Sequence, residues 1–198
     1  MLQGARHVHI SSLNEASKDC GIPIKIVELR KSSDLLNQNI HALVIPGGES
    51  TTMRLTGNSS NSLILPKLLD WLRKNPKIPV LGTCAGAILL SDPQDGQESL
   101  INASINRNAY GRQINSFQAV VETSLLNRSF PGIFIRAPKF DSNISADNIV
   151  ATCDGDIVGV RKHNRIALTF HPELSEDIGF HSWIIEQAKA VLGDSDAT

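Results

Sequence analysis

Short apolar runs alternate with segments of helical period in the first half of the chain. Three runs are rich in Ile, Val and Leu and have the length of buried strands: residues 22–29, 42–45 and 78–81. Apolar positions recur every three or four residues over 10–20 and 65–72, which predicts two amphipathic helices. Gly21 and Asn75-Pro76 follow these segments as helix-ending signals. The alternation predicts a parallel sheet covered by helices on both faces.

The second half of the chain consists of strand-like segments separated by turn residues. In order they are residues 101–105, 116–123, 132–136, 149–152, 156–161 and 165–170. Asp154-Gly155 is a hairpin-turn signal, and Lys162-His163-Asn164 predicts a second tight turn. Tight turns join antiparallel strands, so we expect an antiparallel extension of the sheet. A helix over 181–192 and a polar tail over 193–198, for which we expect fraying, close the chain.

The fold class that follows is α/β, with three layers in which helices cover a mostly parallel central sheet with an antiparallel extension. A chain of 198 residues has the length of one domain with a full-sized core, and neither a linker nor a repeat divides it. We therefore expect a single domain over residues 1–198.

Composition narrows the classes of function. Hydrophobic residues make up 41% of the chain, charged residues 20%, and the net charge is −1, so nothing favours nucleic acid or an anionic membrane as a partner. No apolar run approaches the roughly 20 residues that span a bilayer, and residues 1–10 lack the apolar core of a secretory signal. Cys20, Cys84 and Cys153 are widely spaced and odd in number, which predicts a reduced, cytoplasmic protein without disulfides or a cysteine metal site.

Residues 82–86, Gly-Thr-Cys-Ala-Gly, follow the predicted strand 78–81 and open a predicted helix. They are the thiol counterpart of the Gly-x-Ser-x-Gly nucleophile elbow, in which the nucleophile sits on a tight strand-to-helix turn. Small flanking residues let strand and helix approach closely, and the helix N-terminus favours a thiolate at Cys84. The alternative interpretation is a buried, inert cysteine, the usual state of a free thiol.

A cysteine nucleophile requires a base and a third group that orients the base. His171 and Glu173 directly follow the apolar residues 166–170, so they lie at the carboxyl end of a predicted strand, as Cys84 does. Ligand-handling residues collect at that edge of open α/β sheets, and Pro172 stiffens the turn between the two side chains. We predict that the three side chains meet as nucleophile, base and orienting acid. The alternative is a surface turn with an incidental histidine.

Other segments are weaker candidates when each is taken alone. The glycine-rich turn 46–50 offers bare backbone N–H groups to an oxyanion, or is a plain strand-to-helix turn. Arginines in 107–113 and 134–138 suit a substrate carboxylate, although surface arginines are common. His7 and His9 have the spacing of a metal pair, but no third ligand suggests itself, so we expect solvated histidines.

Together these motifs resemble a class I, triad-type glutamine amidotransferase, and more narrowly the glutaminase subunit of pyridoxal 5′-phosphate synthase, the Pdx2/PdxT family. The matching strings occur in the family's order and are residues 2–5, 46–54, 82–86, 107–113, 134–138 and 170–174. The elbow and the His-x-Glu pair are shared by many class I amidotransferases. The strings Gly-Gly-Glu-Ser-Thr-Thr, Arg-Asn-x-x-Gly-Arg-Gln and Ile-Arg-Ala-Pro single out this family.

The resemblance implies a role for each matched residue. Cys84 would attack the side-chain amide of L-glutamine, and His171, oriented by Glu173, would move the proton. Gly48 and Ala85 would supply oxyanion-hole N–H groups. The family's glutamine-binding positions fall, residue by residue, on Gly48, Glu49, Ser50, Arg107, Ile135 and Arg136. Neither a metal nor another cofactor is implied.

The resemblance also implies a partner, a (β/α)8-barrel synthase subunit that joins the ammonia to ribose 5-phosphate and glyceraldehyde 3-phosphate. Gln3 and Gly4 lie at the position of the family's partner-sensitive loop. Family members have a β-strand just before this dipeptide, whereas Met1 and Leu2 precede it here, so we expect a sheet without that first strand. Two alternatives stay open: a related amidotransferase or cysteine-triad hydrolase serving another reaction, and a non-catalytic copy that only binds the partner.

Overall fold

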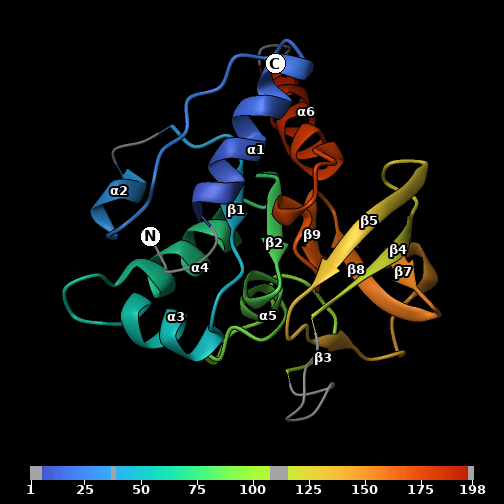
Figure 1. Cartoon of the computed structure of the whole chain (residues 1–198). Coiled ribbons are helices and arrows are strands. Elements are labelled where there is room, and N and C mark those ends of the chain that lie inside the picture. Colours follow the sequence, from blue (N-terminus) through green and yellow to red (C-terminus); the bar gives the residue numbers. More distant parts are fainter. Residues whose placement is uncertain (1–5, 37–38, 108–115, 196–198) are drawn as a thin grey trace.

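The computed structural model describes residues 6–36, 39–107 and 116–195 of the chain. Its helices are α1 (Arg6–Asp19), α2 (Ser33–Leu36), α3 (Ser50–Gly57), α4 (Ile64–Lys74), α5 (Ala85–Ser91) and α6 (Gly179–Ser195), with the short 3-10 helices η1 (Ala146–Asn148) and η2 (Pro172–Leu174). Its strands are β1 (Leu43–Ile45), β2 (Val80–Thr83), β3 (Ile105–Asn106), β4 (Phe117–Thr123), β5 (Arg128–Phe134), β6 (Lys139–Phe140), β7 (Ile149–Cys153), β8 (Asp156–Lys162) and β9 (Arg165–Leu168). Figure 1 shows their arrangement.

Seven of these strands form one sheet in the order β1-β2-β9-β8-β7-β4-β5, and β3 pairs with β6 in a separate ribbon. Strands β1, β2 and β9 are parallel to one another. From β9 outward each pairing is antiparallel, so in the described part of the chain four of the six pairings of the large sheet are antiparallel. The predicted α/β class is confirmed: the parallel part of the sheet consists of β1, β2 and β9, and the antiparallel extension consists of β8, β7, β4 and β5.

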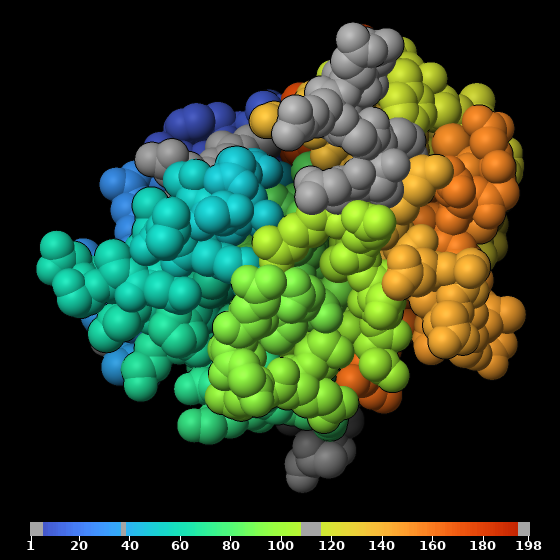
Figure 2. Space-filling model, turned by 90° about the horizontal axis from the view of Figure 1, so that it is seen from below, coloured from blue at the N-terminus to red at the C-terminus, as the bar shows by residue number. Residues whose placement is uncertain are grey.

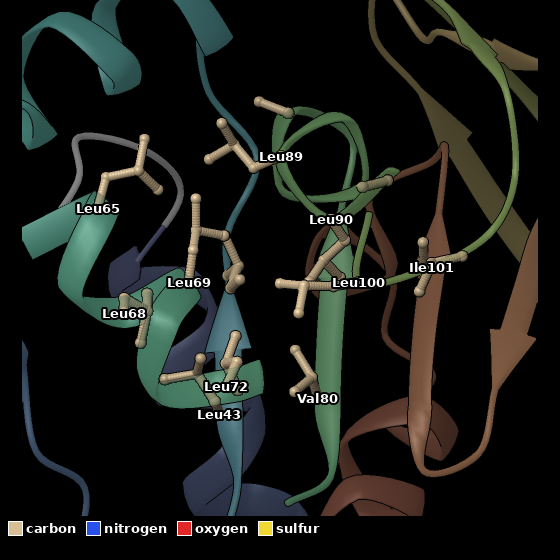
Figure 3. Close-up of a cluster of buried hydrophobic side chains, with 14 of the residues drawn as sticks. Leu43, Leu65, Leu68, Leu69, Leu72, Val80, Leu89, Leu90, Leu100 and Ile101 are labelled. Carbon is tan, nitrogen blue, oxygen red and sulfur yellow. The ribbon is translucent and has the colours of Figure 1, made fainter. Parts of the chain in front are cut away.

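Helices cover both faces of the parallel strands. Side chains alternate across a strand, so Val80 of β2 belongs to the cluster under α4 and α5, and Leu81 to the cluster under α1 and α6. Figure 3 shows the first cluster, to which α4 contributes Leu65, Leu68, Leu69 and Leu72. Burial of each such leucine stabilises the fold by roughly 1.5–3 kcal/mol. Helices α1 and α6 pack side by side on the other face (Figure 1).

Residues 22–29 are the main departure from the predicted elements. Their side chains alternate between half-buried and exposed as in a strand, and Ile22 and Ile24 pack on the α1–α6 cluster. However, no described strand pairs with them, and a cavity of about 570 Å³ lies between them and β1, lined also by α1 and α6. The prediction of a strand is wrong here because an extended segment needs a neighbour's backbone to form a ladder. Strand β1 is therefore an edge strand among the described residues, and no described strand precedes α1.

Smaller departures concern the ends of elements. The strand expected at 101–105 is reduced to the two residues of β3, because Leu100 and Ile101 fill the core under α4 instead. Strand β5 begins earlier than expected, and it accommodates Pro131 because it is the outer strand of the sheet. The turn 46–50 leads into the helix α3, in agreement with the interpretation as a strand-to-helix turn. Helix α6 continues through residues 193–195, the first part of the tail for which we expected fraying.

The described ranges contain no helix with both the length and the apolar character that crossing a membrane requires.

Candidate active site

Cys84 occupies the single position between the end of β2 and the start of α5. Its φ and ψ are 47° and −105°, a conformation that a residue with a side chain adopts at an expense of roughly 1–3 kcal/mol. The Cys84 N–H donates to the carbonyl of Leu168 at 2.8 Å, which fixes the turn to β9. The sequence prediction of a strained strand-to-helix turn at this cysteine agrees with this geometry.

The two glycines of the elbow are required by close approach. A Cβ at Gly86 would lie 2.0 Å from the Ile45 carbonyl oxygen, and one at Gly82 would lie 2.5 Å from Leu90 Cδ1. At Gly86 the obstacle is the backbone of β1, whereas at Gly82 it is the end of the Leu90 side chain together with the Gly86 backbone at 3.1 Å. The spacing Gly-x-Cys-x-Gly therefore reflects the packing of α5 against β1 and β2.

His171 and Glu173 lie beside this elbow, as predicted. The backbone N–H of His171 donates to the carbonyl of Ile133 in β5 at 2.8 Å. The ring Nδ1 of His171 is 2.7 Å from Glu173 Oε1. Cys84 lies close to the His171 ring, since both border the backbone of Gly47. Gly47 packs against both residues, since a Cβ there would lie 2.4 Å from His171 Cε1 and 3.3 Å from Cys84 Cβ. The ends of β2 and β9 thus bring the three predicted side chains together. Figure 2 shows the surface of the molecule from below, with α3 in cyan.

Burial and charge set the protonation of these groups. Burial lowers the pKa of His171, but hydrogen bonds to Cys84 and Glu173 and the charges of both outweigh it and raise this pKa to about 10. Burial raises the pKa of Glu173, yet its hydrogen bond to His171 and the nearby His9 and His171 leave that pKa below its ordinary value. Both side chains are therefore charged at neutral pH, and an imidazolium stands next to the thiol.

Cys153 shows the opposite environment. It is buried in β7, and burial together with Asp154 and Asp156 raises the pKa of its thiol. It is therefore a protonated thiol at neutral pH, which is the inert state.

The predicted residues of the 48–50 turn lie at the start of α3. Glu49 caps this helix, accepting the Thr51 and Thr52 N–H groups at 2.9 and 2.6 Å. The Thr52 hydroxyl and these N–H groups lower the pKa of Glu49 to about 2. Gly48 is exposed and Ser50 is buried. The turn follows β1, so it lies at the same edge of the sheet as Cys84.

The two predicted arginine segments behave differently. Ile135 directly follows β5, and its carbonyl oxygen is 3.9 Å from Cys84 Sγ, which places Arg136 next to the elbow in an exposed position with φ of 44°. Arg107 Nη2 instead donates to Asp92 Oδ2 at 2.9 Å, so its guanidinium is anchored at the end of α5. Gln3, Gly4 and residues 108–115 lie outside the described residues.

Comparison with known proteins decides the family. Residues 1–190 match the SNO glutamine amidotransferase family. The chain belongs to this family. Among curated relatives, the pyridoxal 5′-phosphate synthase subunit PdxT of Thermococcus gammatolerans is 38% identical, over 94% of this chain and 95% of that protein. The PdxT of Methanosarcina mazei is 35% identical, over 94% of each chain.

Solved structures agree with this membership. The crystal structure of a glutamine amidotransferase has a TM-score of 0.74 and 35% sequence identity, and the match covers 95% of this chain and 96% of that one. A glutamine amidotransferase of Thermotoga maritima has a TM-score of 0.56 at 18% identity, over 94% of this chain and 79% of that one, and supports the fold alone. The resemblance stated from the sequence motifs is confirmed.

The sequence patterns of this amidotransferase did not indicate that His9 lies near the site. His9, expected to be solvated, is 3% exposed and lies behind Glu173, whereas His7 is exposed as predicted. His9, Ser12 and Ala16 are the buried residues of α1 and follow a spacing of three to four. That helical period was the available signal for its burial. The described residues contain no group of three or more His, Cys, Asp or Glu side chains placed to bind a metal.

Proposed function

We propose that this chain is the glutaminase subunit of a pyridoxal 5′-phosphate synthase, which hydrolyses L-glutamine to L-glutamate and ammonia at Cys84. The observation that carries the proposal is the buried series Cys84, His171 and Glu173 on a strained elbow. Membership of the glutamine amidotransferase family and the PdxT relatives support the choice of glutamine and of the synthase.

The first half of the reaction forms a thioester. The Cys84 thiolate attacks the side-chain amide carbon of glutamine, and the carbonyl oxygen becomes an oxyanion. Gly48 and Ala85 are the proposed N–H donors to that oxyanion, because both backbones lie beside the elbow and Ala85 is in the first turn of α5, where N–H groups lack helical partners. The imidazolium of His171 then gives its proton to the nitrogen as the carbon–nitrogen bond breaks, and ammonia leaves.

The second half releases glutamate. Neutral His171 takes a proton from water, the hydroxide adds to the thioester carbon, and the carbon–sulfur bond breaks to restore the thiolate. In both halves of the reaction, Glu173 Oε1 accepts a hydrogen bond from His171 Nδ1–H, at 2.7 Å. The other ring nitrogen of His171 is thereby left to face Cys84.

Six residues are proposed to bind glutamine: Gly48, Glu49, Ser50, Arg107, Ile135 and Arg136. The turn at the start of α3 and the segment after β5 flank Cys84 from two sides, which suits a short substrate between them. Arg136 is exposed beside the elbow and offers a guanidinium to the substrate's α-carboxylate. Arg107 is proposed from its family position alone, since its guanidinium is bound to Asp92, at the end of α5 opposite to Cys84.

The ammonia is proposed to pass to a (β/α)8-barrel synthase subunit in the cytoplasm, with Gln3 and Gly4 at the contact. The test measures glutamate release from L-glutamine by the chain alone, with the synthase subunit, and with Cys84→Ala or Cys153→Ala in place of the native chain. We expect release when the synthase is present, a loss of at least about 10³-fold in Cys84→Ala, and no change in Cys153→Ala. Release that survives Cys84→Ala would contradict the proposal, as would a bound synthase without any release.

A further inference from the structure

Two buried histidines lie behind Glu173 and are not used by the proposed reaction. His9 of α1 and His181 of α6 are 3% and 0% exposed, and His9 Nδ1 is 3.0 Å from His181 Nε2. On its other side, His9 Nε2 is 3.2 Å from Thr83 Oγ1 and 3.4 Å from Glu173 Oε2. Glu173 Oε2 has no hydrogen-bond partner in the described part of the chain, so the His9 ring is the polar group that faces it.

The hydrogen-bond distances at His9 allow two tautomers, and only the one with a proton on Nε2 gives the Glu173 carboxylate a donor. Burial lowers the pKa of His9, and burial together with His9 lowers the pKa of His181 to about 3, so both rings are neutral and each carries one N–H. A bare His9 Nε2 would set a lone pair against the Glu173 carboxylate. His9 therefore carries its proton on Nε2, and its Nδ1 accepts the N–H of His181 Nε2. The remaining His181 Nδ1, which has no partner among the described residues, then bears a lone pair.

We propose that His9 is a positioning residue for Glu173, and that His181 fixes the tautomer of His9. The His9 Nε2–H, shared between Thr83 Oγ1 and Glu173 Oε2, keeps the carboxylate ionised and turned so that Oε1 stays on His171 Nδ1. Thr83 is the last residue of β2, directly before Cys84, so the contact of His9 with Thr83 also holds the elbow in place. This inference rests on the proposed function only in that His171 is taken to be the base.

The contact makes α1 part of the site. His9 is the one buried histidine on α1, and that helix packs against both α6 and η2, which carries Glu173. A small displacement of α1 would therefore remove the donor from Glu173 Oε2, and the carboxyl would then bind a proton more readily. With less negative charge beside it, His171 would lose part of its proton affinity.

The test compares two substitutions of His9 in the full chain. His9→Leu removes the donor and keeps a side chain of similar bulk, whereas His9→Gln keeps an N–H at the position of Nε2. Thr123→Val, which removes a buried hydroxyl of β4 far along the sheet, is the matched control for loss of a buried polar group. Proton binding at His171 is followed by ring NMR of the isolated chain, and kcat and KM for glutamine are measured with the synthase subunit.

His9→Leu should weaken proton binding at His171 about tenfold and lower kcat roughly 10- to 100-fold with KM little changed. His9→Gln should recover most of both, and Thr123→Val should change neither. Should His9→Leu fail to fold, His181→Leu decides, with a smaller change in the same direction. Native proton binding at His171 in a folded His9→Leu variant would overturn the inference. If His9→Leu does not fold, the same result in His181→Leu would overturn it. If His171 responds but no variant or native chain releases glutamate, the positioning contact stands and the proposed function fails.

Discussion

The carboxyl end of β2 and the outer edge of β1 lie one strand apart and differ in how completely they are packed. At the end of β2, Gly82 and Gly86 leave no room for a methyl group, and the Cys84 N–H is bonded to β9. At the outer edge of β1, a cavity of about 570 Å³ separates the strand from residues 22–29. The apolar patterns of 22–29 and 78–81 are equally strand-like, so the difference comes from what pairs with each segment. Tight packing is found where the proposed chemistry occurs.

The largest change in stability is expected from a methyl group added at the tightly packed end of β2. Gly86→Ala would place a methyl group 2.0 Å from the Ile45 carbonyl oxygen and should remove at least about 3 kcal/mol of unfolding free energy. The control is Gly193→Ala in α6, where nothing lies within 4 Å, and where a gain of about 0.5 kcal/mol is expected. Urea unfolding measures both. Equal stability of the two variants would contradict the packing described for the elbow.

A pair of isoleucines compares the two regions directly. Ile166 of β9 is 0% exposed, whereas Ile24 is half-buried beside the cavity, and both contact the α1–α6 cluster. Ile166→Ala should lower the unfolding free energy by about 3–4 kcal/mol and Ile24→Ala by about 1 kcal/mol. The same urea assay applies, and a loss at Ile24 as large as at Ile166 would mean that the cavity is filled.

The dependence of stability on pH tests the histidines behind the elbow. The pKa of His181 is lowered to about 3, so below pH 6.5 the unfolded chain binds more protons and stability falls toward pH 3, by up to about 1.4 kcal/mol per pH unit. The pKa of His9 is also lowered, so His9 adds to this loss as the pH falls below 6.5. Glu173, whose pKa is also lowered, adds to this loss below its ordinary value. His171 has the opposite sign, since its pKa is raised to about 10 and its contribution is lost as pH rises from 6.5.

Stability should therefore be greatest near pH 6.5, as measured by urea unfolding across the pH range. His181→Asn should flatten the acid side of this profile, and His171→Asn should flatten the alkaline side. An acid side that is as steep in His181→Asn as in the native chain would show that His181 is not held neutral.

The smallest expected effect separates the two arginines proposed to bind glutamine. Arg136→Ala should raise KM about tenfold, equivalent to about 1.4 kcal/mol, with kcat little changed, because Arg136 is exposed beside Cys84. Arg107→Ala should raise KM by less, about two- to threefold, because its guanidinium is bound to Asp92. Steady-state kinetics with the synthase subunit give both values. A larger rise in KM for Arg107→Ala than for Arg136→Ala would show that the α-carboxylate binds Arg107 instead.

Local patterns were sufficient to predict most elements around the site. The period of the leucines in α4, the apolar run of β2 and the Gly-x-Cys-x-Gly spacing each carry their own structural signal. The meeting of Cys84 with His171 and Glu173 was also predictable, because carboxyl ends of parallel strands share one edge. Residues 22–29 and 78–81 were therefore both predicted as strands, and only the second segment contributes to one, β2.

What could not be predicted depends on neighbours distant in sequence. Residues 22–29 have the pattern of a strand but lack a pairing partner among the described residues. The contacts of His9 with His181 and Glu173 depend on α6 and η2, which lie more than 160 positions further along the chain. The requirement for Gly47 arises from His171, across the sheet edge. Such contacts are set by packing, which periodicity does not report.

The central claim is that Cys84 forms a thioester with glutamine. The most direct test mixes the chain and its synthase partner with isotopically labelled L-glutamine, quenches with acid, and locates the label by peptide mass spectrometry. The account predicts a labelled γ-glutamyl group on the peptide that contains Cys84, none on the peptide that contains Cys153, and none in Cys84→Ala. Label on Cys153, or glutamate release without label at Cys84, would contradict it.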